Sequence, residues 1–244
     1  MGETAKVLPL PESPEKKRRK LILWITGGVV LLSLAAVLIL SFTPVLAAKH
    51  VQVTGASLVS ESALTERLAV LEGTPLPRIS EAMVNELVGD EPAIDELVVR
   101  AQMPDTLVIE IIEAEPVAIL VVGESRHLVA SDGRKLKEIS PDDEFALPAV
   151  NASEETEDAE SFQLLTAILS SIDPEVIAQS SAAKLSQAQF VELALPKDRT
   201  LVWGDAGKAE LKNQVAKIFL EELETSENPP KVIDISNPEN PVTY

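Results

Sequence analysis

The strongest constraint on this chain is a run of 28 residues without a charged side chain, which directly follows five cations. The cations are residues 16–20, KKRRK, and the uncharged run extends from Leu21 to Ala48. As a helix, residues 21–42 would extend about 33 Å, close to the ~30 Å thickness of bilayer hydrocarbon. Because a helix pairs its own backbone polar groups, it can cross lipid. The pattern predicts a single transmembrane helix within residues 21–48.

The position of the cations predicts the orientation of this helix. Positively charged flanks remain on the cytoplasmic side, so residues 1–20 are expected to form a cytoplasmic tail. The rest of the chain would lie outside the cytoplasmic membrane, as in a single-pass type II protein that contacts lipid through residues 21–48. A cleaved signal peptide, ending at the small residues Ala47 and Ala48, is the alternative. Signal cores are about 7–15 residues long, which favours a retained anchor.

The charge balance excludes one class of partner. The chain has 21 Lys and Arg against 39 Asp and Glu, of which residues 1–20 hold six and three. The remainder therefore carries 15 basic and 36 acidic residues, a net charge of −21. Such a surface repels phosphate backbones, so nucleic acid is not expected as a partner. The chain has no cysteine, which excludes disulfides and thiolate metal sites.

Residues 50–113 show a β-α-α-β-β pattern. Residues 50–55 alternate polar and apolar side chains and stop at a glycine, which is typical of a strand that enters a turn. Ser60 and Ser80 are predicted to cap two short amphipathic helices. Two further strands are predicted at 97–102 and 106–113. We expect a three-stranded sheet with both helices on one face.

Residues 117–236 are predicted to form a mixed β domain with helices, followed by a tail at 237–244. One helix is expected to carry an apolar stripe from Phe162 to Ile172. Asp205 is predicted to cap a last helix of about 18 residues. Four of its residues are expected to face inward, namely Leu211, Val215, Ile218 and Phe219. Strands are predicted at residues 117–122, 127–130, 135–139, 183–185, 190–195, 200–203 and 231–236.

Four segments resemble a known family. They are 50–55 (HVQVTG), 103–118 (MPDTLVIEIIEAEPVA), 131–134 (SDGR), and 202–212 (VWGDAGKAELK) with 232–236 (VIDIS). In this order they resemble the FtsQ/DivIB family of bacterial cell division proteins, of actinobacterial type. At Ala114 the chain departs from the family pattern, which has an arginine there. The resemblance implies an α+β fold with one transmembrane helix, a POTRA (polypeptide-transport-associated) domain at 49–116 and a β domain at 117–236.

The resemblance also implies a function. The family consists of non-enzymatic scaffolds that link division partners at the septum and help to control septal peptidoglycan synthesis. The implied partners are FtsB-like and FtsL-like bitopic division proteins. Two alternatives remain open from the sequence, a POTRA-type transport or assembly factor and a membrane-anchored cell-wall enzyme.

Residues that could carry chemistry are few. His50 and His127 are the two histidines, and no H-E-x-x-H or phosphate-loop motif is present. Glu113 and Glu115 are interpreted as solvent-facing carboxylates at a strand end. The acidic run 151–160 lacks the alternating acids of a calcium loop and is interpreted as a solvated loop. No catalytic, cofactor-binding or metal-binding residue is therefore predicted.

The predicted partner-binding site is the last strand, comprising Val232, Ile233, Asp234, Ile235 and Ser236. No strand is recognised after it in the sequence, so we expect it at a sheet edge with unpaired N–H and C=O groups. Such an edge is a template for strand addition by a partner. The alternative is that the tail at 237–244 shields this edge. The resemblance implies partner binding through the C-terminal strand region.

Overall fold

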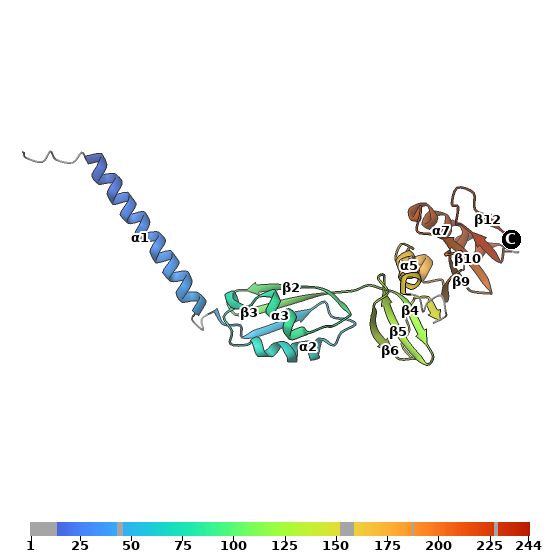
Figure 1. The fold of residues 1–244 in the computed structure, drawn as a ribbon, viewed down its shortest axis with the longest axis horizontal. Helices are drawn as coiled ribbons and strands as arrows, with labels where there is room; N and C mark the ends of the chain where they lie inside the picture. Colours follow the sequence, from blue (N-terminus) through green and yellow to red (C-terminus); the bar gives the residue numbers. More distant parts are fainter. Residues whose placement is uncertain (1–13, 43–45, 152–158, 187, 227–228) are drawn as a thin grey trace, which may run out of the picture.

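The structure, a computed structural model, describes residues 14–42, 46–151, 159–186, 188–226 and 229–244. The chain forms a long helix, a small sheet with two helices and a larger sheet with further helices (Figure 1). The long helix, α1, is Pro14–Phe42. The large apolar side chains between Leu21 and Leu34 are mostly exposed, including Trp24 at 81% and Leu32 at 72%. Within the described ranges, the structure contains no helix that combines the length and apolarity needed to span a membrane.

The end of the predicted span belongs partly to the next domain. Of residues 21–48, positions 43–45 lie outside the described residues. Ala47 and Ala48 are buried, and the backbone N–H of Ala48 donates to the carbonyl of Thr74 at 3.0 Å. The sequence boundary at residue 48 was therefore placed too late, because small apolar residues suit a packed domain as well as a membrane.

The first folded domain has the β-α-α-β-β order that the sequence predicts. Its elements are β1 (His50–Thr54), α2 (Glu61–Leu68), η2 (Ala69–Leu71), η3 (Leu76–Arg78), α3 (Glu81–Val88), β2 (Ile94–Gln102) and β3 (Thr106–Glu113). The strand order is β1-β3-β2, with β1 parallel and β2 antiparallel to β3. The side chains of Ser60 and Ser80 accept hydrogen bonds from the backbone N–H groups of Ala63 and Met83. Both predicted helix caps are therefore confirmed.

The core of this domain follows from the alternation of β3. Leu107, Ile109 and Ile111 are buried on one face, as predicted. Figure 1 shows α2 and α3 on one side of the sheet, and the buried Leu64 and Val84 of these helices join the same cluster. Each fully buried side chain of this kind contributes about 1.5–3 kcal/mol.

Among the residues that the structure describes, the second domain is a nine-stranded mixed sheet with three helices. Its elements are β4 (Pro116–Val122), β5 (Ser125–Ala130), β6 (Lys135–Ile139), β7 (Ala149–Asn151), α5 (Ala159–Leu169), α6 (Pro174–Ile177), β8 (Ala182–Leu185), β9 (Val191–Leu195), β10 (Arg199–Gly204), α7 (Ala209–Thr225), β11 (Val232–Asp234) and β12 (Val242–Thr243). The strand order is β12-β11-β10-β9-β8-β7-β4-β5-β6. The structure has the mixed β domain that the sequence predicts, with two strands that were not predicted, β7 in the middle of the sheet and β12 at its C-terminal edge.

The last helix differs from its prediction in both start and face. It begins after Lys208 rather than at Asp205. Leu211 and Ile218, which were expected inward, are 38% and 64% exposed. Val215 and Phe219 are partly buried and pack against the core as expected, whereas the buried positions of the helix are Lys212, Ala216, Leu220 and Leu223. The prediction is therefore right for two of its four positions, and the buried Lys212 was not among the residues expected on the inward face.

The two domains meet around the Glu113 carboxylate. Its oxygens accept hydrogen bonds from the Leu58 and Val59 backbone N–H groups at 2.8–2.9 Å and from Ser57. Leu58 and Val59 pack against an apolar cluster contributed largely by β4, β5 and β6. The Lys137 ammonium of β6 donates to the Leu58 carbonyl at 2.8 Å. Glu113 is therefore a structural residue at the domain junction, not the solvent-facing carboxylate that the sequence suggested.

Glu113 gives the junction a dependence on pH. Burial raises its pKa, but the hydrogen bonds from the Ser57 hydroxyl and three backbone N–H groups outweigh burial and lower the pKa below its usual value. A lowered pKa stabilises the fold above the unfolded value of about 4.3, and this stabilisation disappears as pH falls through the folded-state pKa. We expect Glu113→Gln to lower the free energy of unfolding by about 1 kcal/mol at pH 7. Below the folded-state pKa the difference should vanish, as denaturant titrations at several pH values can measure. Glu72→Gln, at an exposed position, is the control; an equal loss at low pH would contradict this role.

The glycine that ends β1 is required by close backbone contact. Gly55 has φ +85°, and a Cβ there would lie 2.3 Å from the Ile111 carbonyl oxygen. Gly73 has nearly the same φ, +83°, but open space around it. We expect Gly55→Ala to cost about 3 kcal/mol of unfolding free energy and Gly73→Ala about 1 kcal/mol. Chemical denaturation of both variants tests this, and equal costs would refute the steric explanation.

Candidate functional site

Three of the five residues predicted to bind partners, Val232, Ile233 and Asp234, form β11, one strand inside the sheet edge, and Ile235 and Ser236 follow it directly. β11 is paired with β10 on one side and with β12 on the other. Ile233 and Ile235 are fully buried, so their side chains belong to the core. The expectation that no strand follows β11 was wrong, and the open alternative, a shielding tail, is the correct one. The signal was weak because β12 is two residues long and follows a proline.

The tail returns to the sheet through a turn. The N–H of Asn240 donates to the carbonyl of Asn237 at 3.0 Å, and Pro238 beside it is buried. Glu239 forms an exposed ion pair with Lys208 at 2.7 Å, at the start of α7. These contacts direct residues 242–244 along β11.

β12 is the true edge, and its register shows which backbone groups are free to pair. Tyr244 exchanges two hydrogen bonds with Val232, at 2.9 and 3.1 Å. Along an antiparallel strand, successive residues alternately bond to the partner strand and point their N–H and C=O groups away from it. Tyr244 bonds to β11, and the next residue along the strand is Thr243, which lies opposite Ile233. The N–H and C=O of Thr243 therefore point away from the sheet. Pro241 shares this outward parity, so its missing N–H costs no ladder bond.

The side chains of β12 face both sides of the sheet. Val242 and Tyr244 are 54% and 70% exposed. Thr243 lines a hollow of about 80 Å³ together with Phe219 and Leu223 of α7. A strand added beside β12 would gain backbone bonds at Thr243 and place a small apolar side chain near this hollow.

The two edges of the nine-stranded sheet differ in protection. β6, at the opposite edge, exposes Lys135, Lys137 and Glu138. Charged side chains on an edge strand oppose pairing with another chain. β12 carries no charged side chain. The edge beside the C-terminus, visible in Figure 1, is therefore the one suited to strand addition.

A buried lysine connects α7 to the residue that follows β10. Lys212 is 1% exposed, and its Nζ donates to Oδ1 and to the backbone carbonyl of Asp205, both at 2.9 Å. The hydrogen bond from Lys212, with a second from the Gly207 N–H, lowers the pKa of Asp205. Gly204, at φ +85°, leaves no room for a Cβ, which would lie 2.7 Å from Ser236 Cβ. These contacts fix the ends of β10 and β11 against the start of α7.

Sequence reasoning missed three features of this site. The sequence predicts a tail in place of β12, and it gives Lys212 and Gly204 no role beyond their place in the segment that resembles the family. The segment VWGDAGKAELK was nevertheless a usable signal, because Gly204, Asp205 and Lys212 all lie in it.

Other candidate residues do not assemble into a catalytic or metal centre in the described part of the chain. His50 is exposed in β1, and His127 is half-buried in β5 opposite Leu120. Where the structure describes the chain, no three His, Asp or Glu side chains are grouped to hold a metal ion. The acidic run 151–160 falls mostly on residues 152–158, which lie outside the described residues.

The first folded domain has a counterpart among known protein families. Residues 46–114 match the POTRA domain, FtsQ-type. This match covers the first folded domain, including Ala47 and Ala48. The second domain lies outside this match.

The whole-chain relatives are cell division proteins named FtsQ. The chain is 26% identical over 216 residues to that of Mycobacteroides abscessus, covering 87% of this chain and 67% of the relative. It is 26% identical over 222 residues to that of Mycolicibacterium smegmatis, covering 91% and 64%. The chain thus spans about two thirds of the length of these relatives. The resemblance to the FtsQ/DivIB family that the sequence suggested is confirmed.

A solved structure gives a weaker likeness. The extracytoplasmic domain of the division protein DivIB from Geobacillus stearothermophilus is 14% identical, with a TM-score of 0.34. The match covers 48% of this chain and 99% of that one.

The buried lysine can be tested by a double-mutant cycle. Asp205→Ala leaves the Lys212 ammonium buried with one fewer acceptor, so we expect a loss of about 2 kcal/mol in unfolding free energy. Lys212→Met keeps the aliphatic volume and should cost less. In the Lys212→Met background, Asp205→Ala should cost nearly nothing. Additive losses in denaturant unfolding would show that the two residues act independently.

Proposed function

We propose that this chain is a non-enzymatic bitopic scaffold of the division machinery that joins other division proteins at the septum and helps to control septal peptidoglycan synthesis. The single observation that carries the proposal is the uncharged β12 edge, where Thr243 presents an unpaired N–H and C=O. An edge of this kind serves association between chains. The names of the relatives supply the cellular process, cell division.

The proposed location is the cytoplasmic membrane, with the N-terminus inside and both folded domains outside. Three observations support it: the cations at 16–20, the uncharged run that follows, and the exposed apolar side chains of α1. Apolar side chains exposed along a helix are stabilised by lipid, and the cations favour the cytoplasmic side. Confinement to a membrane also raises the effective concentration of one anchored partner near another.

The proposed partners are FtsB-like and FtsL-like bitopic proteins, one of which adds a strand to β12. In this arrangement Val232, Asp234 and Ser236 support the edge from the neighbouring strand rather than contacting the partner first. The backbone of Thr243 supplies the new hydrogen bonds. The hollow beside Phe219 accepts one small side chain of the added strand.

Thr243→Pro tests strand addition without breaking a bond to β11. The substitution removes an N–H that points away from the sheet, so the domain should remain folded. We expect full-length Thr243→Pro in lipid nanodiscs to bind purified FtsB-like and FtsL-like proteins at least tenfold more weakly. Biolayer interferometry measures the affinity, and thermal unfolding verifies the fold.

Thr243→Val is the matched control, because it keeps the backbone N–H and the β-branched shape. It should bind nearly as tightly as the original chain. Undiminished binding by a folded Thr243→Pro variant would exclude β12 as the docking edge.

A further inference from the structure

A second potential binding site lies where the two domains meet, far along the sheet from β12. It is a cleft of about 610 Å³, a volume typical of ligand sites, which often occur between domains. Its apolar wall includes Val117, Leu147, Ile172 and Ile177. The first domain contributes Asp95 of β2. The cleft is thus lined by residues of both domains, and α6 contributes part of the second domain's side.

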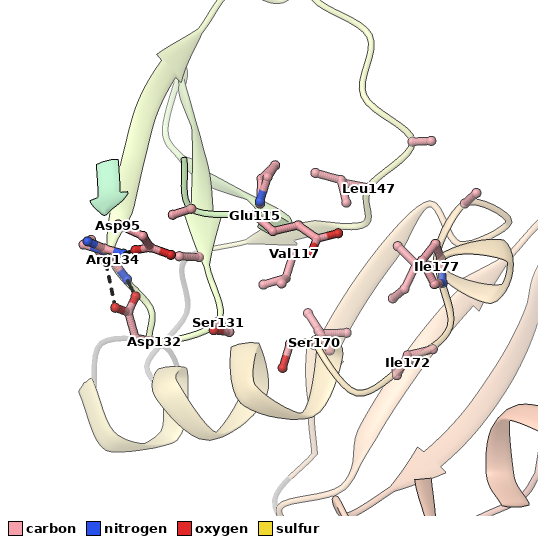
Figure 2. A pocket seen from close by; sticks show the side chains of 17 residues that line it. Asp95, Glu115, Val117, Ser131, Asp132, Arg134, Leu147, Ser170, Ile172 and Ile177 are labelled. Carbon is pink, nitrogen blue, oxygen red and sulfur yellow. Dashed lines mark hydrogen bonds and ion pairs between the residues drawn. The ribbon is translucent and has the colours of Figure 1, made fainter. Parts of the chain in front are cut away.

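The residues that line the cleft include more carboxylates than cations. Arg134 forms ion pairs with Asp95 and with Asp132, so its charge is already compensated. Glu115 projects across the middle of the cleft between this group and Ile177 (Figure 2). Within the described residues, Glu115 has no hydrogen-bond or ion-pair partner. With three carboxylates and one guanidinium, the lining has a net charge of −2.

These features specify the chemistry of an occupant. The wall offers apolar side chains the half-buried Leu147 and the small exposed parts of Ile172 and Ile177, and the solvent-exposed Glu115 carboxylate beside them attracts a cation. The strongly acidic chain disfavours an acidic ligand. A single Lys or Arg flanked by aliphatic residues satisfies both parts of the cleft.

We propose that this cleft binds a segment of a partner protein in which one basic residue stands between aliphatic residues, with the basic side chain paired to Glu115. The aliphatic neighbours of the cation pack on Leu147, Ile172 and Ile177. This site is separate from the β12 edge. It does not depend on strand addition.

The absence of cysteine in the chain allows a direct test. Ser170 is exposed on the rim of the cleft, so Ser170→Cys can carry a single environment-sensitive dye on the full-length protein in nanodiscs. The probe is the peptide GSLKLGS, and the charge-reversed peptide GSLELGS is its control. We expect a saturable change in dye emission with the first peptide and at least tenfold weaker binding of the second.

Substitutions separate this site from others. Glu115→Gln should weaken GSLKLGS binding about fivefold, the effect of losing one ion pair. Glu124→Gln, in the exposed turn after β4, should leave the affinity unchanged, as should Thr243→Pro. Equal binding of the two peptides, no saturable signal, or an unchanged affinity in Glu115→Gln would overturn the proposal. A failure of strand addition at β12 would not contradict the proposal for the cleft, because β12 does not line the cleft.

Discussion

The Glu113 carboxylate determines how the two folded domains are joined. It lies at the end of β3, and two residues separate it from the first strand of the next domain. By accepting backbone N–H groups from residues 57–59, it presents Leu58 and Val59 to the second domain. The same junction brings Asp95 of β2 to Arg134, and both residues line the interdomain cleft.

At the C-terminal edge of the nine-stranded sheet, the backbone hydrogen bonds of β11 alternate between its two neighbouring strands. Odd-numbered residues of β11 bond to β10, and even-numbered residues bond to β12. The buried Ile233 and Ile235 therefore hold the strand in the core, while Val232 holds the last strand in place. The β12 edge is thus supported by the core through one intervening strand. Lys212 and Gly204 fix that strand at its far end.

Much of this architecture could be predicted from local patterns. Serine caps, strand alternation and glycine stops located the first domain, because each of these signals acts within a few residues. Two predictions about α7, Leu211 and Ile218 as inward residues, failed, and the buried Lys212, which bonds to the exposed Asp205, departs from the usual preference of lysine for solvent. β12 could not be predicted from a two-residue signal, since only pairing with β11 makes it a strand. The cleft was equally invisible, because its walls come from positions as distant as Asp95 and Ile177.

The short connection between α1 and the first domain limits where that domain can be. Ala48 is fixed by backbone bonds with Gly73 and Thr74, and α1 ends at Phe42. Five intervening residues reach at most about 20 Å even when fully stretched. If α1 lies in a bilayer, this short connection keeps the POTRA domain close to the lipid headgroups. Only proteins that approach the lipid surface themselves can then meet it.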